Sequence, residues 1–380
     1  MKILFLSHYG AMLGANRSLL SLVQGLKTKG VEVLVYCPKD GPFTAKLKEL
    51  QIPFEIIPYK NWANTFLLPG FWLLPFRHFQ NRRLMPALLE KVKTYNPDII
   101  HTNSSVLGVG AQIAETLQRP HVWHIREFGR LDYNLRFFPN LNNLHKWLAK
   151  ATKIISISDV IKREVIGNND LPIELVFNGV APAAHFQEFT PDYGQTKSKQ
   201  TVTFLLIGML HPNKNQRLAL QGFNIIAQKF PQARLLVVGA GRRLYERKLK
   251  HFCKSNNIES QVHFAGYLPQ PKDAYLQSDV VLMVSKNEAM GRVTAEAMAY
   301  GRPVIGFKGG ATPELIQHGH NGFLFENGAA GLAKYLQHFL EKPEDLKTMG
   351  ENSFATAKEK FTIDKYVDKM YAIFAGLIDK

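Results

Sequence analysis

Short apolar runs alternate with helical patterns along most of the chain, and this alternation constrains the fold more than any other feature. The expected strands of a first series are residues 2–7, 31–36, 54–57, 99–102, 122–125, 154–157 and 175–177. Those of a second series are residues 202–207, 234–238, 262–264, 280–284 and 304–307. Strands that alternate with helices in this way are typical of doubly wound parallel sheets. The sequence therefore predicts an α/β fold with two such sheets and a cleft between them.

A polar stretch at residues 181–201 separates the two series and is expected to be an inter-domain linker. A chain of 380 residues with 46% hydrophobic content is long enough for each domain to have its own core. After residue 324 we expect helices only.

Cysteine usage and apolar windows indicate the compartment. Cys37 and Cys253 are far apart in the sequence and show neither the paired spacing of a metal site nor the framework of a secreted protein. The N-terminal apolar run is too short for a signal peptide. Residues 66–76 form the longest apolar window elsewhere, which is too short to span a membrane. We therefore expect a cytoplasmic protein without a transmembrane helix.

Residues 280–315 carry two expected helix starts that follow buried strands. One helix begins after Gly291, and the other follows Gly309 and Gly310, with Thr312 as the expected N-cap. A helix N-terminus offers unpaired N–H groups and about half a positive charge to an anion, and glycines let the backbone approach it. This stretch therefore favours binding of a phosphorylated ligand.

Two glutamates in the same stretch suggest what else the ligand carries. Glu288 lies on the loop before the first helix, and Glu296 lies about one turn into it. Two carboxylates at this spacing could accept hydrogen bonds from different hydroxyls of one elongated ligand, and a ribose diol would suit one of them. Together with the helix starts, they favour a nucleotide diphosphate-sugar.

A glycine turn follows the first expected strand, where Gly14 opens a helix after the loop at residues 8–13. The spacing does not match a dinucleotide fingerprint, and the strand at residues 31–36 ends in Cys37 and Pro38 without an acid for a ribose. A nicotinamide cofactor is therefore not expected.

His124 lies at the carboxyl end of an expected strand, where open sheets place their ligand sites. A histidine there is either a hydrogen-bonded structural group or a group that contacts substrate. Arg126 and Glu127 follow directly. Arg126 could bind a phosphate or an acceptor carboxylate, or could pair with Glu127 or another acid of the domain, and the sequence leaves these alternatives open.

A set of spaced positions resembles the donor-site signature of one enzyme family. These positions are Glu288, Gly291, Glu296, Ala297, Gly301, Pro303, Val304, Gly309, Gly310 and Glu314. They are similar to the signature of family-4 retaining glycosyltransferases of GT-B fold, of the bacterial glycan-biosynthesis type. The segment IGMLHPNKNQ is similar to the family's diphosphate-binding turn, with Lys214 at the lysine position and Met209 where arginine is usual.

The resemblance implies an architecture of two Rossmann-like doubly wound domains facing across a cleft. Residues 1–182 would form the acceptor-binding domain and residues 200–361 the nucleotide-sugar-binding domain. A C-terminal helix at about residues 362–380 would pack back on the first domain.

The resemblance also implies retaining transfer of a sugar from a nucleotide-diphosphate donor, with UDP as the expected nucleotide. The acceptor would be a glycan or a lipid-linked molecule in cell-surface polysaccharide synthesis. The implied catalytic residues are His124, Glu288 and Lys214. The implied donor-binding residues are Gly14, Gly208, Lys214, Glu288, Ala289, Met290, Gly291, Arg292 and Glu296, and the acceptor or phosphate candidates are Arg126 and Asn16. No metal and no cofactor are expected beyond the nucleotide-sugar co-substrate.

The net charge of +16 favours an anionic partner. Residues 59–83 interleave aromatic side chains with basic ones, among them Trp62, Trp72, Arg82 and Arg83. This pattern is typical of a bilayer interface or of a site for a lipid-linked acceptor, although a segment packed on the first domain's core would show it too. We expect peripheral docking on an anionic membrane surface through this segment.

Three other classes of protein stay open. A nucleotide-sugar epimerase or hydrolase could use the same two-domain cleft. A non-catalytic donor-binding subunit would be consistent with Met209 in place of arginine. Nucleic-acid binding would fit the charge, but the chain contains no recognisable reading module, so no specific nucleic acid is expected.

Overall fold

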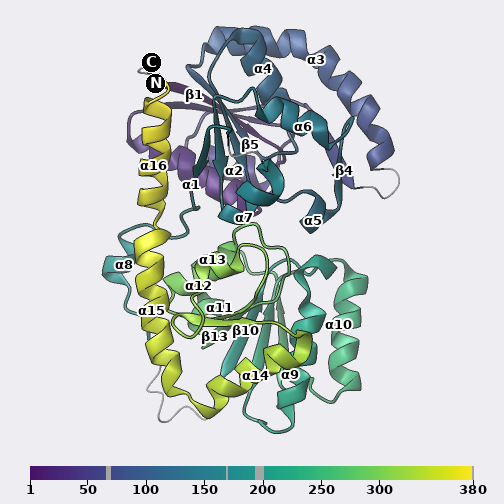
Figure 1. Cartoon of the computed structure of the whole chain (residues 1–380), viewed down its shortest axis with the longest axis vertical. Helices are drawn as coiled ribbons and strands as arrows, with labels where there is room; N and C mark the ends of the chain where they lie inside the picture. The colour runs from purple at the N-terminus through teal and green to yellow at the C-terminus, as the bar shows by residue number, and fades with distance from the viewer. Residues whose placement is uncertain (66–69, 168–169, 193–200, 379–380) are drawn as a thin grey trace. The chain divides into compact units, whose positions relative to one another are not determined.

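The computed structural model describes residues 1–65, 70–167, 170–192 and 201–378, and these form two compact units (Figure 1). The first unit combines Met1–Gly179 with Ile363–Lys380, and the second is Val180–Thr362. Each unit is built around one parallel sheet covered by helices, which confirms the predicted fold class.

The sheet of the first unit has seven parallel strands in the order β3-β2-β1-β5-β6-β8-β9. The strands are β1 (Lys2–Ser7), β2 (Glu32–Cys37), β3 (Phe54–Ile56), β5 (Ile99–Asn103), β6 (His121–Ile125), β8 (Lys153–Ser156) and β9 (Ile173–Leu175). The chain order reverses between β1 and β5. Sheets of this kind bind ligands at the carboxyl ends of the strands beside such a reversal.

Helices cover both faces of this sheet. They are α1 (Gly14–Thr28), α2 (Pro42–Glu49), the 3-10 turn η1 (Phe71–Leu73), α3 (Leu74–Tyr95), α4 (Val109–Leu117), α5 (Arg130–Tyr133), α6 (Leu141–Leu148), α7 (Asp159–Ile161), the π-helical turn η2 (Lys162–Ile166) and α16 (Ile363–Ala375). A short antiparallel pair, β4 (Ala63–Thr65) with β7 (Leu135–Phe137), completes the unit.

The side chains of β1 alternate between two hydrophobic cores, as the two-residue period of a strand requires. Ile3 and Phe5 belong to the core under α1, α2 and α16. Leu4 and Leu6 belong to the core under α3 and α4. Because both faces are covered, the strand is an almost continuous apolar run, which made it easy to predict.

The helix α16 returns to the first unit after the chain has built the second one, and it packs beside α1 (Figure 1). Its buried side chains Tyr366, Met370 and Phe374 belong to the same core as Ile3 and Phe5. Gly25 of α1 makes the close approach of the helices feasible, because a Cβ at this position would lie 2.5 Å from Cγ2 of Val367.

The sheet of the second unit has six parallel strands in the order β12-β11-β10-β13-β14-β15. The strands are β10 (Thr203–Ile207), β11 (Arg234–Val238), β12 (Val262–Gly266), β13 (Val280–Met283), β14 (Val304–Phe307) and β15 (Gly322–Phe325). The helices and turns are α8 (His185–Glu188), η3 (Pro212–Lys214), α9 (Gln216–Ala227), α10 (Arg243–Ser255), α11 (Lys272–Leu276), α12 (Arg292–Ala299), α13 (Thr312–Leu315), α14 (Gly328–Glu341) and α15 (Glu344–Lys360). The reversal of chain order lies between β10 and β13.

The strand β15 corrects the expectation of helices only after residue 324. Its apolar run is short and begins at Gly322, a residue with a φ of +154°. A Cβ on Gly322 would lie 2.1 Å from the carbonyl oxygen of Val304. A glycine usually weakens a strand, but here it allows β15 to pair closely with β14.

The stretch at residues 181–201 contains more than a polar connection. Phe186 of α8 is buried, and the ring of His185 stacks on that of Phe189 with centroids 4.9 Å apart. Nε2 of His185 also lies 2.8 Å from the carbonyl oxygen of Ala299. The first part of the stretch is thus packed on the second unit, while residues 193–200 lie outside the described part of the chain.

Candidate active site

Lys214 and Glu288 form an ion pair at the reversal of chain order in the second unit. Lys214 ends the 3-10 turn η3 that follows β10, and Glu288 lies on the loop that follows β13. Lys214 Nζ lies 2.5 Å from Glu288 Oε1. Because β10 and β13 are neighbours in the sheet, the two loops leave it side by side. The structure therefore places a cation and a carboxylate where a sheet of this kind binds its ligand.

Glu296 lies about one turn into α12, and two other side chains hold its carboxylate in place. Arg292 Nε lies 2.9 Å from Glu296 Oε1, and the Tyr275 hydroxyl donates a hydrogen bond of 2.9 Å to Glu296 Oε2. Burial raises the pKa of Tyr275 well above its usual value, and the charge of Glu296 adds to this shift. Tyr275 thus stays protonated and acts as a donor, which orients the carboxylate of Glu296.

Gly309 and Gly310 bring two loops of this site together. A Cβ on Gly310 would lie 2.6 Å from the backbone N of Glu288, and one on Gly309 would lie 2.8 Å from the backbone O of Lys286. The N–H of Ala311 donates to the carbonyl of Glu288 at 2.8 Å. The expected role of these glycines was approach to a phosphate. In the structure they allow contact with the loop that carries Glu288.

The two helix starts differ from each other. Gly291, with a φ of +80°, is the N-cap of α12. The second helix, α13, begins at Thr312, so that Ala311 is its N-cap, and the expectation of Thr312 as a capping side chain is wrong. The hydroxyl of Thr312 is fully buried instead.

The remaining donor-binding candidates lie after β10, on the loop that carries Glu288, and at the start of α1. Gly208 follows β10 and has a φ of +145°. Its backbone lies very close to Gly239, because a Cβ added to Gly239 would be 1.9 Å from the carbonyl oxygen of Gly208. Met209 follows it with a side chain that is 41% exposed. Met290 is buried beside the partly buried Ala289 on the loop that carries Glu288. Gly14 is the first residue of α1 in the other unit.

Arg126 is the centre of a hydrogen-bonded network in the first unit, just after β6. Its side chain is buried and donates to Oδ1 of Asn103, to Oδ1 of Asn178 at 2.5 Å and to the Tyr366 hydroxyl at 3.0 Å. It also lies 3.2 Å from His124 Nδ1. Arg126 therefore binds neutral groups from four segments. Among these hydrogen bonds there is none between Arg126 and Glu127.

Glu127 has hydrogen-bond partners on the loop after β5. Its Oε1 accepts hydrogen bonds from the Ser104 hydroxyl at 2.7 Å, from the Ser105 N–H at 2.7 Å and from the Ser105 hydroxyl at 2.5 Å. This carboxylate ties the ends of β5 and β6 together. It thereby holds the backbone on which Arg126 lies.

His124 is fully buried at the end of β6. Burial lowers the pKa of His124 well below its usual value, and the charge of Arg126 and the nearby His101 lower it further. The rings of His101 and His124 are 5.5 Å apart. His124 is therefore expected to be uncharged at neutral pH, with one ring nitrogen as a donor and the other as an acceptor.

Asn16, a candidate for acceptor or phosphate contact, holds the loop after β1. Its Oδ1 accepts a hydrogen bond from the Ser7 hydroxyl at 2.8 Å. Its Nδ2 donates to the carbonyls of Tyr9 and Ala11 at 2.8 and 2.9 Å. Both amide hydrogens are thus used within the loop. Asn16 therefore holds the shape of this loop, and its contact with acceptor or phosphate stays a prediction.

The aromatic side chains of residues 59–83 divide into a buried and an exposed group. Trp62 is buried, with its Nε1 donating to the carbonyl of Ser105 at 2.9 Å. Trp72, Phe76 and Phe79, by contrast, are 65%, 59% and 52% exposed. Phe66 lies outside the described residues. Only the second part of the segment thus has the exposure that docking would need.

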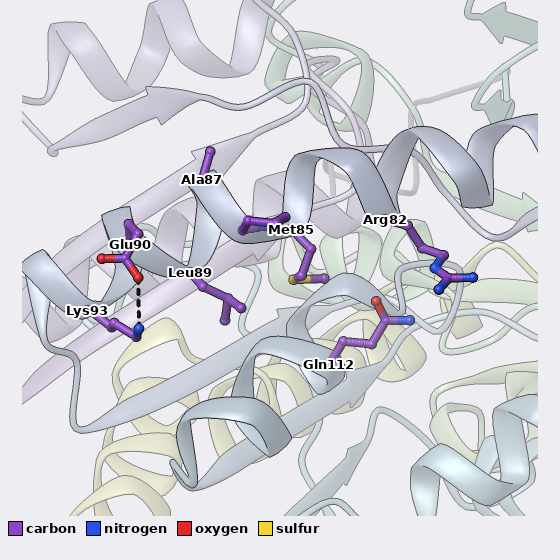
Figure 2. Close-up of a pocket in the computed structure, with 8 residues that line it drawn as sticks. Arg82, Met85, Ala87, Leu89, Glu90, Lys93 and Gln112 are labelled. Atoms are coloured by element: carbon purple, nitrogen blue, oxygen red, sulfur yellow. Dashed lines mark hydrogen bonds and ion pairs between the residues drawn. The ribbon is translucent and has the colours of Figure 1, made fainter.

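A hollow of about 660 Å³ lies on the first unit between α3 and α4 (Figure 2). It is lined by Arg82, Met85, Pro86, Ala87, Leu89, Glu90, Lys93 and Gln112. Arg82 belongs to the segment expected to face a membrane or a lipid-linked acceptor, whereas none of the expected donor-binding residues lines the hollow.

The described residues contain neither a candidate metal site nor a candidate membrane span. In that part of the chain, no three His, Cys, Asp or Glu side chains lie close enough together to hold a metal ion. Likewise, no helix there has the length and apolar character needed to cross a membrane.

Tyr275 and Tyr366 are site residues that the sequence did not identify. Each orients a predicted residue, Tyr275 through Glu296 and Tyr366 through Arg126. A tyrosine with such a role has no recognisable spacing, because its partner lies 21 positions away in the first case and 240 in the second. Only the folded arrangement reveals it.

Comparison with protein-family models gives two matches that together cover most of the chain. Residues 13–184 match the model "Glycosyltransferase Family 4", and residues 192–356 match "Glycosyl transferases group 1".

Among individual proteins, the chain is 28% identical over 309 residues to the N-acetyl-alpha-D-glucosaminyl L-malate synthase of Bacillus anthracis, covering 78% of this chain and 79% of the relative. It is 23% identical to the alpha-monoglucosyldiacylglycerol synthase of Acholeplasma laidlawii, covering 97% and 94% of the two chains. The crystal structure of Anabaena Alr3699/HepE in complex with UDP-glucose has the same fold, with a TM-score of 0.81, 24% identity and coverage of 99% and 100%.

Proposed function

Since the chain belongs to the group 1 and family 4 glycosyltransferases, a retaining family of GT-B fold, we propose that it transfers a sugar from a UDP-sugar to a glycan or lipid-linked acceptor. The observation that carries this proposal is the Lys214–Glu288 ion pair at the reversal of chain order in the second unit. A cation beside a carboxylate suits a ligand that carries both a diphosphate and sugar hydroxyls.

The choice of a UDP-sugar has two supports. The similar HepE protein was crystallised with UDP-glucose. In this chain, Glu296 is oriented by Tyr275 and Arg292 near the start of α12, and a fixed carboxylate of this kind suits a ribose diol.

The proposed roles follow from the charges. Lys214 stabilises the departing diphosphate, and Glu288 accepts hydrogen bonds from the transferred sugar. His124, in the first unit, is proposed to contact a sugar of the substrate. The acceptor oxygen attacks the anomeric carbon from the side that the diphosphate leaves. The bond from that carbon to the phosphate oxygen breaks as the new glycosidic bond forms, and the departing phosphate takes the acceptor proton.

A panel of nucleotide sugars tests the donor site. We expect UDP-glucose or UDP-N-acetylglucosamine to raise the melting temperature in a concentration-dependent way, because a ligand that binds only the folded state stabilises it. GDP-mannose and inorganic diphosphate are the comparison ligands. The shift should be lost in Lys214→Ala and kept in Lys254→Ala, an exposed lysine in the last turn of α10. A shift with GDP-mannose alone would contradict the choice of UDP.

Product analysis separates transfer from the other reactions that the same fold could support. With a UDP-sugar and a panel of glycan and lipid acceptors, a transferase gives UDP and a new glycoside. An epimerase gives a second UDP-sugar without any acceptor, and a hydrolase gives the free sugar. Donor binding without turnover on any acceptor would favour a non-catalytic subunit, in which Met209 replaces a needed cation.

We further propose that the reaction takes place at a membrane surface, as a step of cell-surface polysaccharide synthesis. The exposed part of α3 and η1 supports the membrane surface. Trp72, Phe76 and Phe79 are exposed there beside Arg82 and Arg83, and the Arg83 guanidinium lies 5.1 Å from the centre of the Phe79 ring. The sequence has no Asp or Glu between Glu55 and Glu90. Aromatic side chains with cations and no acids are complementary to an anionic lipid surface.

Co-sedimentation with vesicles tests this surface. We expect binding to phosphatidylglycerol vesicles, weaker binding to phosphatidylcholine, and loss of binding when Trp72, Phe76 and Arg82 are replaced by serine. The matched control replaces Arg243 and Leu244 on α10, where Leu244 is 67% exposed beside basic side chains. An equal loss of vesicle binding in both variants would mean that any exposed basic and apolar side chains cause the binding, and that the surface on α3 and η1 has no special part in it.

A further inference from the structure

The network around Arg126 determines which nitrogen of His124 carries the proton. A guanidinium has five N–H donors and no acceptor. Since Arg126 Nη2 lies 3.2 Å from His124 Nδ1, that nitrogen must accept the hydrogen bond and carry the lone pair. In a neutral imidazole the hydrogen is then on Nε2.

The same contact disfavours the charged form of His124. A protonated imidazole has hydrogens on both nitrogens, so its Nδ1–H would point at a guanidinium hydrogen. The ring also lies in a fully buried position, 5.5 Å from the ring of His101. Burial, Arg126 and His101 all lower the pKa of His124.

Arg126 is itself held by groups from distant parts of the chain. Nε donates to Asn103 at the end of β5, and Nη1 donates to Asn178 after β9. The two hydrogens of Nη2 serve His124 and the Tyr366 hydroxyl, which lies 3.0 Å away on α16. Tyr366 is buried and its ring packs near that of His124, with centroids 6.4 Å apart. Tyr366 therefore fixes the direction of the hydrogen that Arg126 offers to His124.

The Nε2 atom of His124 is buried and has no hydrogen-bond partner among the described residues. Buried polar groups in folded proteins almost always have such a partner. His124 also stands at the carboxyl end of β6, which is next to β5 in the sheet. These observations indicate a donor that is oriented for an oxygen atom of a ligand.

We infer that Tyr366 is a positioning residue, which acts through Arg126 to hold His124 as a neutral Nε2–H donor to a hydroxyl or ring oxygen of the substrate. His124 therefore does not remove a proton in the reaction. This assignment rests on the proposed function only in taking a sugar as the ligand. The tautomer and the part played by Tyr366 are properties of the protein alone.

Nitrogen-15 NMR of the full chain labelled in histidine tests the tautomer without any substrate. We expect the His124 resonances, identified by their loss in His124→Gln, to show a protonated Nε2 and an unprotonated Nδ1 from pH 7.5 to 5.5. In Tyr366→Phe the same resonances should move toward a mixture of both tautomers. A wild-type Nδ1–H tautomer, or a charged ring at pH 6, would overturn the inference even if the protein proves to be a transferase.

Tyr371→Phe is the matched control, because Tyr371 lies on the same helix and is 36% exposed. It should leave the His124 resonances unchanged. Since the wild-type tautomer is measured on the unaltered protein, the inference stays testable even if Tyr366→Phe folds poorly. An unchanged tautomer in a well-folded Tyr366→Phe variant would show that Tyr366 has no positioning role.

Kinetics give a second, independent readout once a donor is known. The side-chain nitrogen of glutamine can occupy the place of Nε2, whereas that of asparagine lies nearer the place of Nδ1. We therefore expect His124→Gln to retain at least about 10-fold more kcat than His124→Asn, and Tyr366→Phe to lower kcat by about 3- to 10-fold, the range for loss of one neutral hydrogen bond. Equal loss in the two His124 variants would contradict a donor at Nε2. A protein with the expected tautomer but no transfer activity would refute the proposed function alone.

Discussion

At the scale of single residues, the second unit holds its candidate groups in pairs. Lys214 neutralises Glu288, and Arg292 with Tyr275 orients Glu296. A paired side chain has lost much of its rotamer freedom before any ligand binds. The entropy that a ligand must overcome in ordering these groups is correspondingly smaller.

Replacing either member of the Lys214–Glu288 pair should lower turnover strongly. We expect Lys214→Ala and Glu288→Ala each to reduce kcat by about 10²-fold, as removal of a contact made in the transition state does. Because the two side chains touch, the double variant should lose much less than the product of the two single losses. Steady-state kinetics with the preferred UDP-sugar measures this, with Lys254→Ala, at the end of α10, as the control. Activity within a few-fold of wild type in both single variants would remove them from the catalytic site.

Tyr275 should affect donor affinity more than chemistry. Tyr275→Phe removes the donor to Glu296 and keeps the ring that stacks on Tyr300, with centroids 5.3 Å apart. We expect KM for the UDP-sugar to rise by about 3- to 10-fold with kcat little changed, since one neutral donor is lost at a group assigned to the ribose. Tyr335→Phe is the control, because Tyr335 lies on α14 and is a partly buried tyrosine packed against the core of the same unit. A fall in kcat with unchanged KM would place Glu296 at the reacting sugar instead.

At the scale of elements, the crossing of α1 and α16 depends on one small residue. Gly25 leaves room for Val367, whose Cγ2 atom would be 2.5 Å from an added Cβ. Val367 is buried and branched, so it cannot turn aside as a long flexible side chain could. The position therefore specifies how closely the last helix approaches the first.

Gly25→Ala should therefore lower the free energy of unfolding by about 1–3 kcal/mol through overpacking, partly offset by the better helix propensity of alanine. Adding Val367→Ala should recover part of the loss, because it removes the clashing methyl groups. Urea unfolding of the two single variants and the double variant measures the coupling. If the changes in unfolding free energy are strictly additive, Gly25 and Val367 are not coupled, and the added methyl group is accommodated by a shift of the helices.

Elements differ in how much of them could be predicted from the sequence. β1 and β14 were predicted to the residue because they are continuous apolar runs between polar turns, as strands covered on both faces are. β15 was missed because its apolar part is only three residues long and its pairing depends on the backbone of Val304. Trp62 and Trp72 look alike in sequence, yet one is buried and the other exposed.

The same limit applies to the candidate site. Glu288 and Lys214 could be selected because they lie in recognisable turns beside strand ends, and Glu296 because it lies on the helix that follows the first of these turns. The partners of Arg126 could not, since three of them come from segments far away in the chain. Asn16 shows the reverse case, a polar residue in the right turn whose groups are used by the loop itself.

At the scale of the whole molecule, the charging of several histidines in the first unit opposes folding. His101, His121 and His124 are buried, and His8 is half-buried. Burial is the main cause in each case, and it lowers the pKa of His8 and of His121 to about 3 and that of His101 and of His124 well below the usual value. The unfolded chain takes up a proton at each of these residues as the pH falls below about 6.5. Stability should therefore be lost from that pH downward, by up to about 1.4 kcal/mol per pH unit for each histidine.

Asp132 opposes this trend. Burial raises the pKa of Asp132 to about 7, so the folded form keeps a proton that the unfolded form releases above about pH 4. Four groups outweigh one, so urea unfolding should show a free energy that falls between pH 6.5 and 5. In His121→Gln, unfolding should take up about one proton fewer, so the free energy of unfolding should depend less steeply on pH. A wild-type stability that is constant over this range would show that the histidines are charged in the folded protein.

The membership of α16 in the first unit has a consequence for how the protein is made. The ribosome must complete all of residues 180–362 before the last helix can reach the core that contains β1. At about 5–20 residues per second, the nascent first unit waits roughly 10 to 40 seconds with part of its apolar surface uncovered. The second unit is made in one piece and can fold first, although its sequence is translated later.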